Sequence, residues 1–260
     1  MKRWLLIVPL SLLLLEGVYA ETPEEKGLAI VMESDRRDTG WQDQKASLRM
    51  VLRNRHGDES ERKNHSRTLE VNNDGDKSLI IFDSPRDIKG TAFLSFTHSL
   101  KADDQWLYLP ALKRVKRISS SNKSGPFMGS EFAYEDLASL EVDKFRYKYL
   151  KEDQHEGRDT FVVTFYPQYK HTGYKKQIVW IDKEHYQPLK VEFYDRKDSL
   201  LKTLTYNENK QYLNRYWRPG RMEMVNHQTG KSTSLYWTSY EFQTGLSDRD
   251  FDKNSLKRAR

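Results

Sequence analysis

The sequence contains no cysteine among its 260 residues. That absence excludes disulfides, thiolate metal sites, a cysteine nucleophile and a lipid-modified cysteine at the start of a mature chain. A eukaryotic secreted domain of this size would more often use disulfides, so an exported chain without them favours a bacterial periplasm.

Motifs for catalysis and metal binding are also scarce. The seven histidines never recur at HxH or HxxxH spacing, and there is no Gly-x-Ser-x-Gly motif. Gly230-Lys231-Ser232 resembles the end of a phosphate-binding loop, but Val225 stands where that loop needs glycine, so we interpret it as a hairpin. The adjacent carboxylates Asp103-Asp104 and Glu135-Asp136 are interpreted as a turn and a helix start rather than as acid/base pairs. We therefore expect no enzyme, no metal and no cofactor, although a carboxylate pair assembled from distant strands stays open.

Long apolar runs are lacking outside the N-terminus. There, Lys2 and Arg3 precede an apolar core from Trp4 to Leu15, and Val18-Tyr19-Ala20 offers a cleavage site. About 12 apolar residues are too few to cross a hydrocarbon core of roughly 30 Å. We predict that residues 1–20 are a secretory signal peptide cleaved near Ala20, that residues 21–260 form one domain, and that the protein is periplasmic.

A dense block of basic residues is lacking too. The formal net charge is +6, and the basic residues are spread along the chain. This distribution does not favour binding to nucleic acid.

Alternation of apolar and polar residues with a period of two dominates the chain after about residue 40. It recurs about a dozen times at roughly 10-residue spacing, with hairpin signals such as Pro219-Gly220 and Thr229-Gly230 between the segments. The pattern predicts a mainly β protein built on one large antiparallel sheet. Three short helices are also predicted, the first with a capping box of Thr22 and Glu25: residues 23 to about 40, 131–140 and 248–256.

The polar residues of the predicted strands share one face, which gives the sheet a wet face and an apolar face. Three modest helices cannot cover a large apolar face. A strongly curved sheet buries that face around a cavity that helices partly fill. We therefore expect a curled antiparallel sheet with helices over its concave face.

Residues 77–137 combine the most apolar strands with a loop rich in Ser, Gly, Asn and Pro. If the curled sheet encloses a hollow, large side chains of these strands are candidates for its lining, and the apolar residues of the loop are candidates for its lid. The candidate cavity residues are Phe82, Phe93, Phe96, Trp106 and Leu109, and the candidate lid residues are Phe127, Met128 and Phe132. The alternative is that the strand aromatics are ordinary core and that the loop residues only pack onto it.

A basic strand follows these apolar strands. Its four cationic residues are Lys113, Arg114, Lys116 and Arg117. Three interpretations stay open: contact with anionic lipid head groups or an acidic partner surface, a solvated strand face, and protection of a sheet edge.

Four motifs carry a family resemblance: Ser84-Pro85-Arg86-Asp87-Ile88-Lys89-Gly90, Gln105-Trp106-Leu107-Tyr108-Leu109-Pro110, Lys116-Arg117-Ile118 and Phe127-Met128-Gly129-Ser130-Glu131-Phe132-Ala133-Tyr134-Glu135-Asp136-Leu137. Through them the chain resembles the LolA-like outer-membrane lipoprotein-sorting proteins, in particular the branch found with resistance-nodulation-division (MMPL-type) exporters. The resemblance implies a half-open barrel closed by helices, lipid-modified cargo in its hollow, and an inner-membrane exporter as partner.

Three functions are weighed on this basis. A periplasmic carrier of lipoprotein or lipid predicts a sizeable apolar hollow. A non-carrying accessory protein of an exporter predicts a filled core. A hydrolase of envelope glycans or lipids predicts buried carboxylates, or a His–carboxylate pair, in a cleft.

Overall fold

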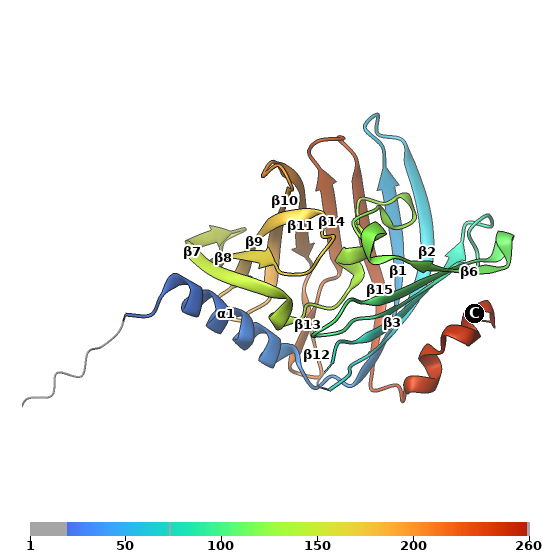
Figure 1. Ribbon diagram of the computed structural model, residues 1–260, viewed down its shortest axis with the longest axis horizontal. Coiled ribbons are helices and arrows are strands. Elements are labelled where there is room, and N and C mark those ends of the chain that lie inside the picture. Colours follow the sequence, from blue (N-terminus) through green and yellow to red (C-terminus); the bar gives the residue numbers. More distant parts are fainter. Residues whose placement is uncertain (1–19, 73, 259–260) are drawn as a thin grey trace, which may run out of the picture.

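The computed structural model describes residues 20–72 and 74–258, and Figure 1 shows how their elements are arranged. The predicted signal peptide lies outside this part of the chain, except for Ala20. No helix among the described residues is long and apolar enough to span a bilayer.

The only α-helix of the described residues is α1, Pro23–Asp38. It begins with the predicted capping box, in which the Thr22 hydroxyl accepts the Glu25 N–H at 3.2 Å and the Glu25 carboxylate accepts the Thr22 N–H at 2.8 Å. Gly27 allows α1 to lie directly against β7 (Phe145–His155), because an added Cβ would come within 2.8 Å of the Tyr149 nitrogen.

Thirteen strands of the described residues form one antiparallel sheet in the order β6-β5-β4-β3-β2-β1-β15-β14-β11-β10-β9-β8-β7. The predicted antiparallel architecture is confirmed. The remaining sheet strands are β1 Asp43–Arg53, β2 Glu59–Leu69, β3 Lys77–Ser84, β4 Ala92–Phe96, β5 Asp104–Leu109, β6 Arg114–Ile118, β8 Arg158–Pro167, β9 Tyr174–Asp182, β10 Pro188–Asp195, β11 Leu200–Asn207, β14 Arg221–Asn226 and β15 Ser232–Phe242. A separate small ribbon pairs β12 (Lys210–Tyr212) with β13 (Tyr216–Arg218).

The sheet curls into a half-barrel that does not close. Its edges, β6 and β7, do not pair with each other within the described residues. Register shifts interrupt several ladders, for example at Ser47/Leu48 between β1 and β15 and at Tyr149/Lys151 between β7 and β8. Such bulges bend strands and increase twist, which is how a sheet of this width curves.

Two apolar clusters lie on the two faces of the curled sheet. The larger covers the concave face and includes Phe82, Phe93, Val163, Val191 and Met224. The smaller lies on the outer face of β3–β5, where the C-terminal segment covers it with Phe251 and Leu256. Figure 1 shows α1 and that segment at opposite ends of the sheet.

Two of the three predicted helices are 3₁₀ turns instead. Only η4, Tyr134–Leu137, forms within residues 131–140, because the Tyr134 and Glu135 N–H groups bond the carbonyls of Gly125 and Lys123 rather than a preceding helical turn. The C-terminal segment is two turns, η6 Asp248–Phe251 and η7 Lys253–Arg258, separated by an extended Asp252. The other 3₁₀ turns are η1 Pro110–Leu112, η2 Ser120–Asn122, η3 Phe127–Gly129 and η5 Val142–Lys144.

Candidate functional site

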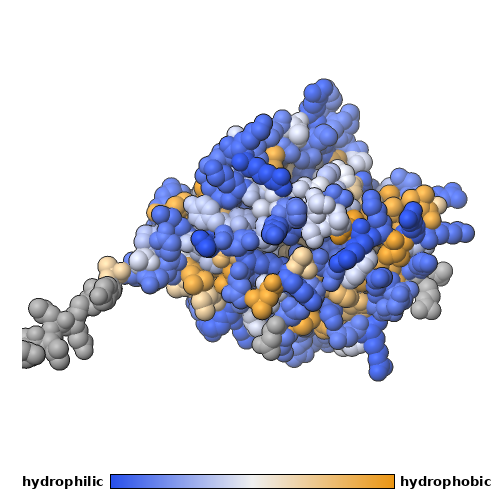
Figure 2. Space-filling model, viewed as in Figure 1, coloured by the Kyte–Doolittle hydropathy of each residue, from blue (hydrophilic) through white to orange (hydrophobic). Residues whose placement is uncertain are grey.

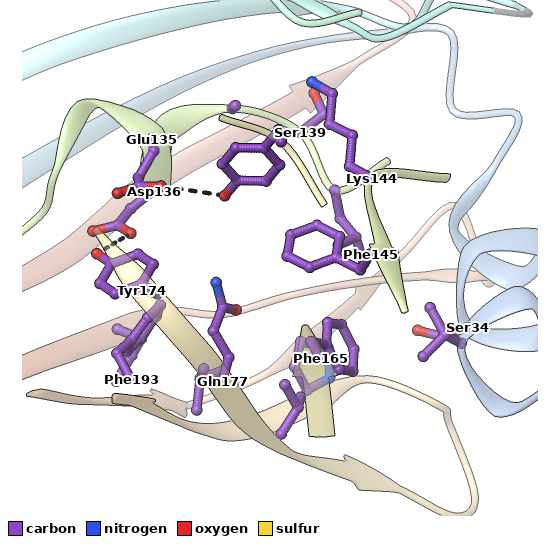
Figure 3. Close-up of a pocket in the computed structure, with 18 of the residues that line it drawn as sticks. Ser34, Glu135, Asp136, Ser139, Lys144, Phe145, Phe165, Tyr174, Gln177 and Phe193 are labelled. Atoms are coloured by element: carbon purple, nitrogen blue, oxygen red, sulfur yellow. Dashed lines mark hydrogen bonds between the residues drawn. The ribbon is translucent and has the colours of Figure 1, made fainter. Parts of the chain in front are cut away.

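A cavity of about 220 Å³ lies between the concave face of β8–β11 and residues 131–144, which we name the cover segment. The floor consists of strand residues and is mostly apolar, with Gln177 as a polar member; its apolar residues are Phe165, Val179, Ile181, Val191, Phe193 and Leu204. Val31 and Ser34 of α1 also line the cavity, and Figure 3 shows Ser34 at one end of it. The strands thus provide apolar contact area, whereas the cover segment provides polar groups.

Asp136 of the cover segment contacts side chains of two strands of the sheet. Its carboxylate accepts a hydrogen bond from the Tyr174 hydroxyl at 2.7 Å and lies 2.6 Å from the Lys202 ammonium. Lys202 also donates to the Glu131 carbonyl at 2.9 Å. These contacts tie the cover segment to β9 and β11.

Glu135 makes a parallel set of bonds to the end of β9. Its carboxylate accepts the Thr172 hydroxyl at 2.8 Å, the Gly173 N–H at 2.8 Å and the Tyr169 hydroxyl at 3.2 Å. Burial raises the pKa of Glu135, and these donors oppose that rise. Figure 3 shows Glu135, Asp136 and Tyr174 converging at one end of the cavity.

Asp103, Lys123 and Lys144 form a second buried ionic group at the cavity wall. The Asp103 carboxylate lies 2.5 Å from the Lys144 ammonium and 3.7 Å from that of Lys123, and all three side chains are at most 10% exposed. Lys123 also lies 3.9 Å from the centroid of the Tyr169 ring. Burial lowers the pKa of Lys123, while the charge of Asp103 raises it.

Asp76 and Glu141 meet near the other end of the cover segment. The Ser139 hydroxyl donates to Asp76 at 3.2 Å, and the Glu141 carboxylate lies close to the backbone at Gly75, where an added Cβ would come within 2.6 Å of it. Burial raises the pKa of Asp76 to about 6, with smaller contributions from the charges of Glu70 and Asp38. Burial, followed by the charge of Asp76, raises the pKa of Glu141 to about 7. This end of the cover segment therefore holds two acids whose neutral forms are favoured by the fold relative to an exposed carboxyl.

The hydrogen bonding of Glu135 and Asp136 limits their chemistry. A general acid or base needs a free position for the substrate's proton. Every oxygen of the two carboxylates already accepts a bond from the protein. The arrangement fastens the cover segment to β11 and to the start of β9.

Six of the eight predicted cavity and lid residues come together on the concave side: Phe82, Phe93, Leu109, Phe127, Met128 and Phe132. The Phe127 ring is 5.2 Å from that of Phe93 and 5.9 Å from that of Phe82. The Met128 carbonyl accepts a bond from Arg62 at 2.5 Å. None of these residues lines the cavity, which lies over β8–β11 instead, so their functional roles stay predictions.

Phe96 and Trp106 lie on the opposite face of the sheet from Phe93. They pack together with ring centroids 5.2 Å apart, beneath the C-terminal segment. Alternation along β4 and β5 explains their place, because Phe96 shares the orientation of Leu94, not of Phe93. Phe96 and Trp106, which were predicted to line the cavity, therefore do not face the concave side.

The four predicted contact residues lie at one edge of the sheet. Lys113, Arg114, Lys116 and Arg117 are exposed on or beside β6, and Arg117 forms an ion pair with Asp104. The face of the molecule seen in Figure 2 is largely hydrophilic, with apolar patches between the polar side chains.

Sequence reasoning missed the polar groups of the cavity. The Glu135-Asp136 pair was interpreted as the start of a helix and Asp103-Asp104 as a turn. In the structure Glu135 and Asp136 lie inside the 3₁₀ turn η4, and Asp104 is the first residue of β5. Their partners Lys202 and Tyr174 lie 66 and 38 residues further along the chain from Asp136. The one local signal is the position of these charges inside a segment rich in Phe and Tyr.

Comparison with known proteins gives a family model and solved structures. A family model described as an uncharacterized protein matches residues 74–258. A crystal structure described as an outer membrane lipoprotein-sorting protein domain, from Vibrio parahaemolyticus, is 60% identical; the match covers 90% of this chain and 100% of that one, with a TM-score of 0.89.

Two further structures are similar. A DUF1329 family protein from Desulfovibrio piger is 30% identical over 90% of this chain and 99% of that one, with a TM-score of 0.86. A LolA superfamily protein from Nitrosomonas europaea, 20% identical over 88% of this chain and 98% of that one, shares the fold with a TM-score of 0.70. The search of curated proteins gives no match.

Proposed function

Because the chain belongs to the outer-membrane lipoprotein-sorting family with the LolA-like fold, we propose that it is a periplasmic carrier of lipid-modified or other apolar cargo. The observation that carries the proposal is the cavity between β8–β11 and the cover segment, on the concave face of the half-barrel. An acyl chain of about 15 carbons costs on the order of 10 kcal/mol when it is exposed to water. A periplasmic carrier must therefore enclose nearly all of its cargo.

The size of the cavity says what binding requires. Ligand pockets commonly measure roughly 300–1,000 Å³, whereas this cavity measures about 220 Å³. A short apolar group fits as it stands, but a full acyl chain requires the cover segment or the Phe127 loop to move. Phe127, Met128 and Phe132 are the proposed gate, since Phe127 fills the concave side of β3 and β4.

The experiment is native mass spectrometry with lipid extraction on the mature protein, purified from a periplasmic fraction without detergent. A reproducible bound mass that extracts as acyl lipid or a lipidated peptide is the expected result. A clean apo mass, with no uptake of added lipid or lipidated peptide, would reject the carrier.

The gate has its own test. The double change Phe127→Asp with Met128→Asp is expected to alter lipid uptake and release. If the double variant does not fold, Met128→Asp alone serves instead, because Met128 is half-buried and this variant keeps the buried Phe127 ring. Unchanged uptake and release in a folded double variant would remove the gate from the proposal.

The basic residues of β6 support a second part of the proposal, contact with an anionic membrane surface or with an exporter of the resistance-nodulation-division (MMPL) type. Each Lys or Arg near an anionic surface contributes about 1 kcal/mol. Arg114→Glu with Lys116→Glu is expected to abolish flotation with anionic vesicles. Unaltered flotation would leave these residues as protection of the β6 edge.

An accessory protein without cargo is the alternative, and it needs no hollow. A hydrolase is less favoured, because Glu135 and Asp136 are buried in the cavity wall but have no free oxygen for a substrate. The accessory protein predicts no copurifying lipid.

A further inference from the structure

A second hollow, which we name the rim groove, lies where residues 121–133 meet the turns after β10 and β14. Its volume is about 740 Å³, within the roughly 300–1,000 Å³ of ligand sites. Tyr174 lines both the rim groove and the apolar cavity. The two hollows are therefore neighbours across a wall formed by that ring and its partner Asp136.

The rim groove is lined by more positive than negative charge. Its charged lining residues are four cations, Arg196, Lys197, Lys202 and Lys231, and two carboxylates, Glu131 and Asp195. The groove thus differs from the cavity, whose ionic groups are paired within the wall.

Most of these groups already have partners. Lys202 is paired with Asp136, and the Arg196 guanidinium donates to the Thr172 carbonyl at 2.7 and 2.9 Å. The Glu131 carboxylate accepts the Asn226 amide at 2.7 Å.

The second carboxylate is also engaged, and two cations are left over. Asp195 accepts the Gln228 amide at 2.9 Å and the backbone N–H of Lys197 at 2.9 Å. In the described part of the chain, the ammonium groups of Lys197 and Lys231 form no ion pair with a carboxylate. Hydrogen bonds from Gln228 and the backbone, and lastly the charge of Lys197, lower the pKa of Asp195, so Lys197 interacts with that carboxylate at a distance. Both lysine side chains are exposed at the groove, and an incoming anion meets them without first breaking a direct ion pair.

We propose that the rim groove binds the phosphate of an amphiphile whose apolar part lies in the neighbouring cavity. This inference rests on the proposed carrier function and names its cargo class. A phosphate monoester carries nearly two charges and three acceptor oxygens, which suit the two ammonium groups and the Arg196 guanidinium that also lines the groove. Movement of Tyr174 away from Asp136 connects the two hollows.

The experiment compares three probes on the mature protein at low ionic strength. Lysophosphatidic acid has one acyl chain and a phosphate, monoacylglycerol of the same chain length lacks the phosphate, and glycerol phosphate lacks the chain. The test variant is Lys197→Gln with Lys231→Gln. The matched control is Lys89→Gln with Lys210→Gln, two exposed lysines that line neither hollow.

The wild-type protein and the control are expected to bind lysophosphatidic acid about tenfold or more tightly than monoacylglycerol. The test variant is expected to lose this preference while its affinity for monoacylglycerol is unchanged. Added salt is expected to reduce the preference, since the lysines are exposed.

The other outcomes separate the groove from the carrier function. Equal binding of the two lipids by the wild type, or a preference that survives in the test variant, overturns the groove proposal but leaves the carrier. If neither lipid binds while glycerol phosphate does so through the two lysines, the carrier fails and the groove is a site for free phosphate esters. If no probe binds, both proposals fail.

Discussion

The ammonium of Lys202 lies 2.6 Å from a carboxylate oxygen of Asp136, and these side chains are only 4% and 6% exposed. The pair joins β11 to the cover segment across the end of the cavity, with the Tyr174 hydroxyl as a third member. A buried ion pair is a weak source of net stability, because desolvation of both charges offsets their attraction. Its effect is to define one position of the cover segment over the strands.

Removal of one partner should therefore be costly. Lys202→Met leaves the Asp136 carboxylate as an unpaired buried charge, and Asp136→Leu leaves the Lys202 ammonium as an unpaired buried charge. Each change is expected to lower the free energy of unfolding by about 3–5 kcal/mol, measured by urea denaturation. The double variant, with no buried charge, should recover much of the loss.

A surface pair provides the control for this prediction. Lys175 and Asp198 lie 3.3 Å apart but are 55% and 37% exposed. Lys175→Met should cost less than about 1 kcal/mol. A similar small cost for Lys202→Met would show that the buried pair does not hold the cover segment.

The two acids near Ser139 predict a dependence of stability on pH. The pKa of Asp76 is about 6 and that of Glu141 about 7 in the folded protein, above their usual values near 4. Their neutral forms are favoured by the fold, so their stabilising effect is complete below about pH 4 and is lost as the pH rises through 6 and 7. For Asp76 the loss is of the order of 2–3 kcal/mol.

The comparison variant is Asp76→Asn with Glu141→Gln, which keeps the shapes and removes the titration. Urea denaturation from pH 4 to 8 should give a wild-type stability that falls relative to this variant as the pH rises. Glu156→Gln, at an exposed turn, should follow the wild type. A constant difference between wild type and double variant across this range would contradict the assignment.

Local patterns of the sequence were sufficient for much of the fold. The capping box of Thr22 and Glu25, the period-two alternation and the hairpin at Gly230 all appear in the structure as predicted. These features depend on a few neighbouring residues, so the sequence contains all the information they need. The family resemblance provided the half-barrel arrangement.

The face of each strand could not be predicted in the same way. Strand β3 is apolar on both faces. Leu79 and Ile81 lie on the outer face under the C-terminal segment, whereas Ile80 and Phe82 lie on the concave face. A run without alternation indicates a strand covered on both faces. That signal was available, and it would have separated Phe96 and Trp106 from the concave group.

The cavity itself depends on contacts that no local pattern carries. Asp136 meets Lys202 only because the sheet brings β11 beneath the cover segment. The aromatic residues between β3 and β5 gave the stronger sequence signal, but Phe127 fills the space over them. The open space lies over β8–β11 instead.

Filling the cavity provides a direct test of where cargo binds. Val191 on the floor is almost fully buried and faces the open space, so Val191→Phe should occupy much of it. Overpacking costs up to about 1–3 kcal/mol, and less where a cavity receives the ring. Lipid uptake, measured by native mass spectrometry, should fall strongly.

The matched control for this variant is Val225→Phe on β14. Val225 is half-buried and lines neither hollow. The Val225→Phe variant should take up as much lipid as the wild type. If Val191→Phe folds and still takes up lipid fully, the cargo binds elsewhere on the concave face.

The C-terminal segment should contribute to stability through the outer face of the sheet. Phe251 is 1% exposed and packs with Leu79, Ile81 and Leu94, on the side opposite to the cavity. Phe251→Ala is expected to cost about 3–5 kcal/mol in urea denaturation. Leu100→Ala, at a side chain that is 88% exposed, should change stability by less than about 0.5 kcal/mol. Because Phe251 does not touch the cavity, the folded variant should bind lipid as the wild type does; weakened binding at full folding would mean that the two faces of the sheet are coupled.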